Sequence, residues 1–172
     1  MKKISLFLAV VFGISAAAMA DNLVHNGEFE RLDAKGNAIG WSASTVKNGS
    51  VKFFATGAPD GGYAQIVLNA PEVFSIRQCL NGKVKPNTKY ELSFKVRAVD
   101  FSAKNVGVLF INEGWTKNSG ISNIKPTAQW QKYKAIVTTP DFKKYVAIVF
   151  HGTQAKGTIE IADIEVEELD ND

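Results

Sequence analysis

The chain has 172 residues, of which 45% are hydrophobic and 22% are charged, and its formal net charge is +3. This length and composition suit a single globular domain with a hydrophobic core and leave no room for a second domain. The 20 basic side chains are scattered along the chain, and the lack of a basic stripe argues against a nucleic-acid-binding protein.

The first twenty residues are typical of a secretory signal peptide. Lys2-Lys3 is followed by a short apolar run over residues 6–14 and then by the small-x-small motif Ala18-Met19-Ala20. The apolar run is too short to cross a bilayer, so we expect no membrane span and predict cleavage after Ala20. The mature protein is then secreted or periplasmic, two locations that the sequence does not separate.

Strand signals fill the rest of the chain, whereas helix signals are almost absent. In chain order, strands are expected over residues 41–46, 51–56, 63–68, 73–80, 90–96, 106–112, 129–138, 145–151 and 157–167. Residues 90–96 show the cleanest alternation of apolar and polar side chains, which predicts one buried and one solvent-facing side. With a turn every eight to twelve residues, the pattern predicts an all-β, antiparallel β-sandwich of the jelly-roll kind.

Two local features near the end of the chain carry further predictions. The alternation of apolar residues changes phase at Ala162-Asp163, which indicates a β-bulge. The domain is expected to span residues 21–167, and the acidic tail that follows, including residues 168–172, is expected to fray from Glu167 onward.

The single cysteine, Cys79, is interpreted as a buried, inert thiol in preference to a reactive one.

The sequence lacks the motifs of common hydrolases. It has two histidines, His25 and His151, and neither a Gly-x-Ser-x-Gly elbow, nor a zinc-binding His/Cys cluster, nor a glycine-rich phosphate loop. A small β-sandwich glycosidase stays open as the weakest alternative, because sequence alone does not place two carboxylates across a glycosidic bond.

Several motifs together resemble the carbohydrate-binding modules of the family 4/9 type, which accompany bacterial cellulases and xylanases. In order they are Asn22-Leu23-Val24-His25-Asn26-Gly27-Glu28-Phe29-Glu30, Gly40-Trp41, Arg77-Gln78, the turn and strand over 84–94, the Trp-x-x-Tyr run over 129–133, and the closing run over 161–166. Asn87 stands where the family usually has glycine, and Ala162 where it usually has aspartate. The resemblance covers nearly all of the mature chain and implies a galactose-binding-like jelly roll that binds polysaccharide without catalysis.

The resemblance also implies a structural calcium ion where the first and last strands meet. Carried over residue by residue, Glu28 and Glu30 supply oxygen ligands from the N-terminal segment, and Asp163 supplies a carboxylate from the last strand. Calcium takes six to eight oxygen ligands, from carboxylates and backbone carbonyls. The alternative is that these acids are solvated edge charges that discourage the addition of another strand.

The ligand is expected in a cleft across one sheet, where aromatic rings contact the apolar faces of sugars and polar groups bind their hydroxyls. Trp115 lies in a polar, glycine-rich loop over residues 112–120 and is interpreted as a stacking platform, or alternatively as a lid over the core. Trp41 and Trp130 are assigned to the core. The polar and aromatic partners of Trp115 are predicted to be Arg77, Asn112, Tyr63 and Gln65. A salt bridge is the alternative role for Arg77, and His151 either lines the same cleft or ends its strand in solvent.

The sequence therefore predicts a secreted, non-catalytic carbohydrate-binding protein for a β-glucan, a xylan or a similar polysaccharide or oligosaccharide. A separate glycoside hydrolase is a conceivable partner, because such modules normally accompany an enzyme. The alternative is a periplasmic or cell-surface interaction domain that binds protein or peptidoglycan with the same sandwich. A groove with Trp115 at its wall favours the sugar, and a large exposed apolar patch without a cleft favours the protein partner.

Overall fold

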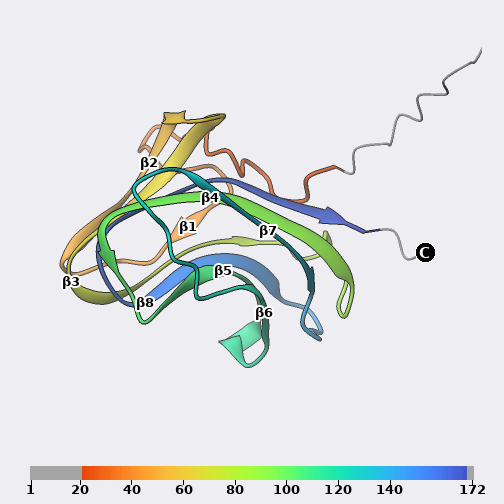
Figure 1. Ribbon diagram of the computed structural model, residues 1–172. Coiled ribbons are helices and arrows are strands. Elements are labelled where there is room, and N and C mark those ends of the chain that lie inside the picture. The colour runs from red at the N-terminus through yellow and green to blue at the C-terminus, as the bar shows by residue number, and fades with distance from the viewer. Residues whose placement is uncertain (1–20, 170–172) are drawn as a thin grey trace, which may run out of the picture.

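The computed structural model describes residues 21–169, which form an all-β sandwich (Figure 1). The predicted signal peptide lies outside these residues. The strands are β1 (Ser42–Ala43), β2 (Gly49–Ala58), β3 (Gly61–Cys79), β4 (Lys89–Ser102), β5 (Asn105–Asn112), β6 (Asn118–Ile121), β7 (Gln131–Thr138) and β8 (Val146–Glu168), with a 3-10 turn η1 (Glu113–Trp115) between β5 and β6. All the ladders are antiparallel, so the predicted fold class is confirmed. Within residues 21–169, no helix has the length and apolarity needed to cross a membrane.

Two long strands, β3 and β8, bend so that each takes part in both layers of the sandwich (Figure 1). The first layer has the order β2, β3, β8, β4, β7 and uses the start of β3 and the end of β8. The second layer has the order β1, β3, β8, β5, β6 and uses the end of β3 and the start of β8. Each of these strands was expected as two separate strands. Pro71 lies where β3 and β8 lose register between Leu68 and Glu72, a position where the missing N–H of proline disrupts no ladder.

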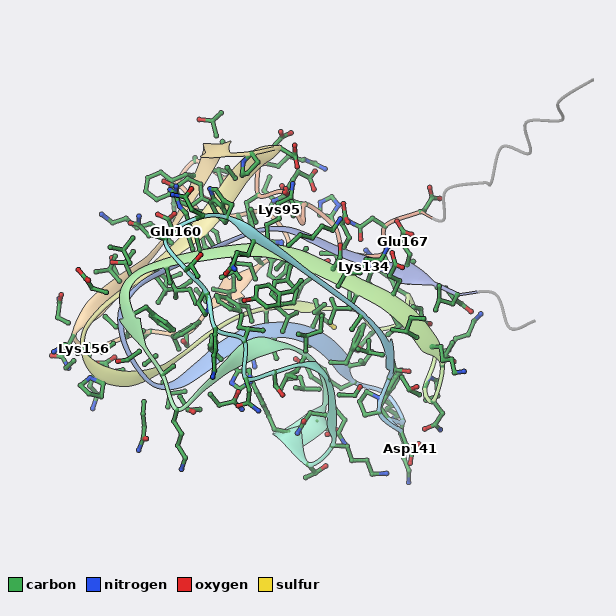
Figure 2. All side chains as sticks on the ribbon, in the orientation of Figure 1. Lys95, Lys134, Asp141, Lys156, Glu160 and Glu167 are labelled. Carbon is green, nitrogen blue, oxygen red and sulfur yellow. The ribbon has the colours of Figure 1, made fainter. Side chains whose placement is uncertain are left out.

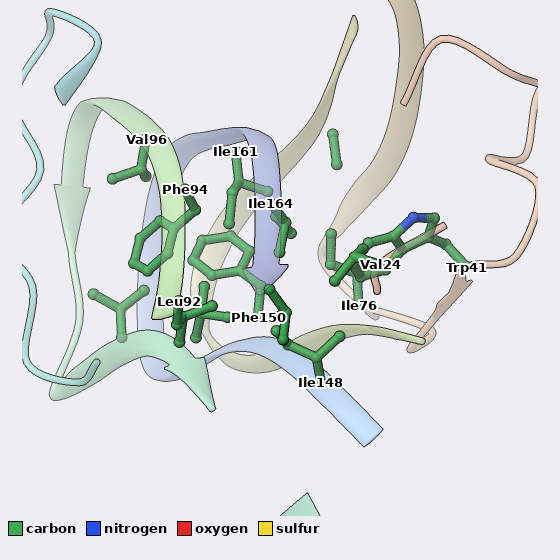
Figure 3. Close-up of a cluster of buried hydrophobic side chains, with 14 of the residues drawn as sticks. Val24, Trp41, Ile76, Leu92, Phe94, Val96, Ile148, Phe150, Ile161 and Ile164 are labelled. Atoms are coloured by element: carbon green, nitrogen blue, oxygen red, sulfur yellow. The ribbon is translucent and has the colours of Figure 1, made fainter. Parts of the chain in front are cut away.

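The hydrophobic core lies between the two layers (Figure 3). The alternation predicted for residues 90–96 is present, because Leu92, Phe94 and Val96 are fully buried while Lys95 of the same strand points outward. Trp41 is buried as predicted, and its indole Nε1 donates a hydrogen bond to the carbonyl of Asn26 at 2.9 Å.

A buried amide fixes the N-terminal segment to the second layer. Gln78 is 4% exposed, accepts a hydrogen bond from the backbone N–H of His25 at 2.7 Å and donates one to the His25 carbonyl at 2.6 Å. Further along, the carbonyl of Gly27 accepts a hydrogen bond from the N–H of Ile164 at 3.1 Å. The first residues of the domain therefore lie beside the last strand, as the resemblance implied.

The last strand confirms one local prediction and corrects another. Ser93 pairs with Glu165 and Lys95 with Ala162, so β8 carries one extra residue, Asp163, whose φ is +50°. This is the predicted bulge. The tail does not fray at Glu167, because β4 begins at Lys89 and pairs with β8 as far as Glu168.

The environment of Cys79 also differs from the prediction. Its side chain is exposed, because Cys79 points outward from β3 like Arg77, whereas the residues on either side of it, Gln78 and Leu80, point into the core.

Candidate functional site

The five predicted ligand residues lie on two opposite outer faces of the sandwich. Tyr63 and Gln65 are on the first half of β3 and face outward from the first layer, whereas Arg77, on its second half, faces outward from the second layer. Asn112 and Trp115 also belong to the second layer, at the end of β5 and in η1. The single cleft containing all five does not form, because β3 passes from one layer to the other while keeping the same side turned outward.

On the first layer, the polar side chains that point outward hydrogen-bond to one another. Gln65 Nε2 donates a hydrogen bond to Glu160 Oε1 at 2.7 Å, and Arg97 Nε donates to the other oxygen of this buried carboxylate. The Arg97 guanidinium lies 4.8 Å from the ring centroid of Trp130, and Tyr63 meets the same indole edge-on at 6.2 Å. Trp130 is thus half-buried over an ion pair outside the core, which corrects its assignment as a core residue. Figure 2 labels Glu160 on this side of the molecule.

On the second layer, the turn η1 presents Trp115 to solvent. The indole is 39% exposed, and the backbone has a positive φ at both Gly114 (+70°) and Trp115 (+60°). A tryptophan in the left-handed region is strained, and such strain is kept where the surrounding structure enforces it. Asn112 does so: its Oδ1 accepts a hydrogen bond from the N–H of Lys117 at 2.8 Å, and its Nδ2 donates one to Thr116 Oγ1 at 2.9 Å. The Asn112 amide is therefore engaged within the loop.

Three neighbouring hollows follow one another across this face and share lining residues. The first, of about 310 Å³, lies beside Trp115 and His151. The second, of about 360 Å³, lies between Trp115, Arg77 and Tyr145. The third, of about 440 Å³, shares Asn112, Glu113 and Tyr145 with the second and continues along residues 141–144. We call these three hollows together the Trp115 groove.

The groove lies beside a small buried apolar cluster and has few polar groups that are free to bind. Leu109, Ile111, Ala147 and Val149 form a small buried cluster against which Tyr145 packs. The guanidinium of Arg77 has no hydrogen-bond or ion-pair partner among residues 21–169. Tyr145 was not identified from the sequence, although it precedes a strand and has the same outward orientation as Ala147.

His151 lies at the bottom of the first hollow. It is 8% exposed, and its ring meets the Trp115 indole edge-on, with centroids 5.7 Å apart. Burial lowers the pKa of His151 below its usual value, so the imidazole is neutral at neutral pH. Its Nε2 is buried and has no hydrogen-bond partner among the described residues, so the cleft-lining alternative for His151 matches its position.

Two acids line the groove. Asp141, labelled in Figure 2, makes an ion pair with Lys117 at 2.8 Å, and the hydrogen bond from Lys117 lowers the pKa of the Asp141 carboxyl. A glycosidase needs one carboxyl group whose pKa is raised so that it can donate a proton. Asp141 is shifted in the opposite direction, and the remaining acid in the groove is Glu113.

The three predicted calcium ligands differ in how well they suit a cation. The Oδ2 of Asp163 is buried and already makes an ion pair with the Lys95 ammonium at 2.9 Å, which a calcium ion would have to replace. The Glu30 carboxylate lies against Gly61, and the Glu28 carbonyl accepts a hydrogen bond from the N–H of Gly62 at 2.9 Å. No three His, Cys, Asp or Glu side chains within residues 21–169 gather as a metal cluster. Backbone carbonyls would have to complete a calcium site here.

Comparison with solved structures shows the same fold in several carbohydrate-binding modules. A structure titled "CBM4 structure and function" is 24% identical, with a TM-score of 0.59, and the match covers 84% of this chain and 99% of that one. The CBM22-1 xylan-binding domain of Xyn10C from Paenibacillus barcinonensis is 17% identical, with a TM-score of 0.59 and coverage of 89% and 97%. The module TmCBM61, solved with β-1,4-galactotriose, is 14% identical, with a TM-score of 0.61 and coverage of 87% and 100%.

An enzyme also contains this fold as a part. The enzymatically active domain of tailspike protein 4 from bacteriophage CBA120 is 15% identical over 86% of this chain, with a TM-score of 0.63, but the match spans only 21% of the tailspike chain. No curated protein matches the sequence. The sequence model of the family described as "Carbohydrate binding domain" matches residues 21–157. The chain therefore belongs to this family, the carbohydrate-binding modules of the 4/9 type.

Proposed function

We propose that this protein binds a polysaccharide such as a xylan or a β-glucan along the Trp115 groove, without catalysing a reaction. The observation that carries the proposal is the position of Trp115, which is partly exposed and lines two adjoining hollows. The C–H face of a pyranose ring can stack on such an indole, because both surfaces are flat and apolar.

Polar contacts come from side chains on either side of this platform. Arg77 has unpaired guanidinium donors, and Tyr145 lines the same hollow, so both can hydrogen-bond to sugar hydroxyls. The affinity is expected to be modest, because an open, solvated groove gains little beyond the cost of ordering the ligand.

Three related expectations stay predictions. We propose that calcium, where it binds, uses Asp163 and backbone carbonyls near Glu28 and Glu30, and that it contributes to stability at the junction of the first and last strands. Export through the predicted signal peptide and cooperation with a separate glycoside hydrolase are predictions that rest on the sequence alone.

The experiment is affinity electrophoresis of residues 21–172 through gels containing xylan, β-glucan, mannan, galactan or hydroxyethylcellulose. We expect retardation by at least one glycan, and loss of that retardation in Trp115→Ala. The matched control is Trp130→Ala, which removes the same side chain from the opposite face of the sandwich and should leave the retardation unchanged. Loss of binding in the control alone would move the site to the first layer. Migration unaffected by every glycan would overturn the proposal in favour of a protein partner.

A further inference from the structure

The first hollow of the Trp115 groove is a separate, small pocket with one unused polar group. Its lining is Val73, Phe74, Ser75, Trp115, His151 and Thr153. Its volume of about 310 Å³ lies at the lower end of the range for ligand pockets, roughly 300–1,000 Å³. The pocket is therefore large enough for one substituted sugar unit and not for a length of chain.

The unused group is the imidazole of His151. The side chain is more than nine-tenths buried, yet its Nε2 has no partner within residues 21–169. A buried polar atom without a partner costs free energy unless a ligand or a water satisfies it. On the adjacent strands, His151 pairs with Ser75 and with Gly107. Gly107 has no side chain that could hydrogen-bond to His151 Nε2.

The walls around this nitrogen are mostly apolar. Val73 is 64% exposed, the Trp115 indole stands over the ring of His151, and Phe74 contributes from below, leaving the hydroxyls of Ser75 and Thr153 as the other polar groups. An unsubstituted sugar ring carries several hydroxyls, and most of them would lose their water partners here without replacement. The better match is a group with one apolar end and one hydrogen-bond acceptor.

An acetyl group has this composition, with a methyl group beside a carbonyl oxygen. We propose that the pocket beside Trp115 binds an acetyl substituent on a sugar, with the methyl group against Val73 and Trp115 and the carbonyl oxygen accepting a hydrogen bond from the imidazole of His151. The inference rests on the proposed function, since it places the acetylated unit of a glycan that lies along the same groove. The acetyl group could be carried as an ester on a xylan or as an amide on an N-acetylhexosamine polymer.

The test compares uncharged glycans with and without acetyl groups. Isothermal titration of residues 21–172 would use an acetylated xylan and the same xylan after alkaline deacetylation, and chitotetraose against cellotetraose, which has a hydroxyl in place of each acetamido group. We expect about tenfold tighter binding of the acetylated member of one pair, which corresponds to one hydrogen bond and one buried methyl group. The pair that shows the difference identifies ester or amide as the source.

Two variants test the assignment of the pocket. His151→Phe keeps a ring beside Trp115 but removes the hydrogen bond, and should lower the affinity for the acetylated glycan to about that for the unacetylated one. Val73→Trp, at an exposed position that tolerates a larger side chain, should do the same by filling the pocket. The control is Val99→Trp, which is 52% exposed on the first layer and should preserve the preference for acetylation.

The outcomes separate the two proposals. Equal binding of acetylated and unacetylated glycans by the wild-type protein overturns the acetyl pocket and leaves the proposed function standing. A preference that survives both His151→Phe and Val73→Trp also overturns the pocket. Binding to no glycan overturns both proposals together.

Discussion

Asn112 should control glycan affinity through the loop that holds Trp115 in place. Its side chain makes two hydrogen bonds inside the loop, at 2.8 Å to the N–H of Lys117 and at 2.9 Å to Thr116 Oγ1. These bonds oppose the strain of Trp115 at φ +60°, a conformation that costs a non-glycine residue about 1–2 kcal/mol. Asn112→Ala removes both bonds without changing any residue of the hydrophobic core.

The expected effect on affinity follows from these two terms. A solvent-exposed hydrogen bond contributes about 0.5–1 kcal/mol net, so two of them contribute about 1.4 kcal/mol, a factor of ten in an equilibrium constant. Without them the strain of Trp115 is no longer offset, and the fraction of molecules with Trp115 in place falls from about a half to roughly a tenth. The apparent Kd for the glycan rises by about fivefold.

The assay is titration of tryptophan fluorescence with the glycan that is retained best in the electrophoresis panel. Asn112→Asp should stay within about threefold of wild type, because a carboxylate still accepts from Lys117 N–H and can accept from the Thr116 hydroxyl. Asn69→Ala, an exposed asparagine in the middle of β3, is the matched control. If Asn112→Ala binds within twofold of wild type, the loop does not depend on this tether and the reasoning is wrong.

Three further predictions concern stability. Gln78→Leu leaves the backbone N–H and carbonyl of His25 unpaired and should lower the free energy of unfolding by about 2–4 kcal/mol in urea titrations; a loss below 1 kcal/mol would contradict this. Because burial lowers the pKa of His151 from 6.5, the unfolded chain binds the proton first as the pH falls. The stability that the folded protein gains from holding His151 neutral is complete above pH 6.5, and it is lost as the pH drops toward the folded-state pKa of His151. His151→Gln should remove it from urea titrations at pH 7.5 and pH 5, and an identical pH dependence in that variant would refute the assignment. Millimolar calcium should raise the melting temperature relative to EDTA, and Asp163→Asn should abolish that difference; equal melting temperatures in wild type would dismiss the calcium proposal.

The periodicity of the sequence was sufficient for the fold class and for much of the core. The alternation over residues 90–96 directly identified the buried side of β4, and the phase change at Asp163 identified the bulge. The continuity of β3 was hidden by residues 69–71, whose Asn-Ala-Pro sequence is typical of a turn. These residues stay extended because they lie in a gap in the pairing with β8.

The candidate site was only partly predictable for a related reason. Alternation tells which side chains point away from the core, but it does not tell which layer carries them. Tyr63 and Gln65 were therefore grouped with Arg77, although the bend in β3 places them on the far face. The exposure of Trp115 could be anticipated from its polar, glycine-rich loop. The burial of His151 could not, since it depends on the fold of a loop more than thirty residues earlier in the chain.

The contrast between the two outer faces explains why binding is assigned to the second layer. On the first layer many charges already have a partner, in the ion pairs Lys95–Asp163, Arg97–Glu160, Lys132–Glu165 and Lys134–Glu91. Lys95, Glu160 and Lys134 can be followed on this side in Figure 2. A ligand that lay there would have to separate or desolvate these pairs, and the cost would cancel most of what new hydrogen bonds return.

The second layer presents the opposite situation. Its exposed apolar surface is the Trp115 indole, while Arg77 and His151 Nε2 retain hydrogen-bonding capacity that no described neighbour uses. A sugar bound across Trp115 displaces water from an apolar surface and satisfies groups that are otherwise unpaired, and it breaks no internal contact in doing so. Both terms favour association. Replacing Arg97 on the first layer should therefore affect stability, through the uncompensated Glu160 carboxylate, and leave glycan affinity unchanged.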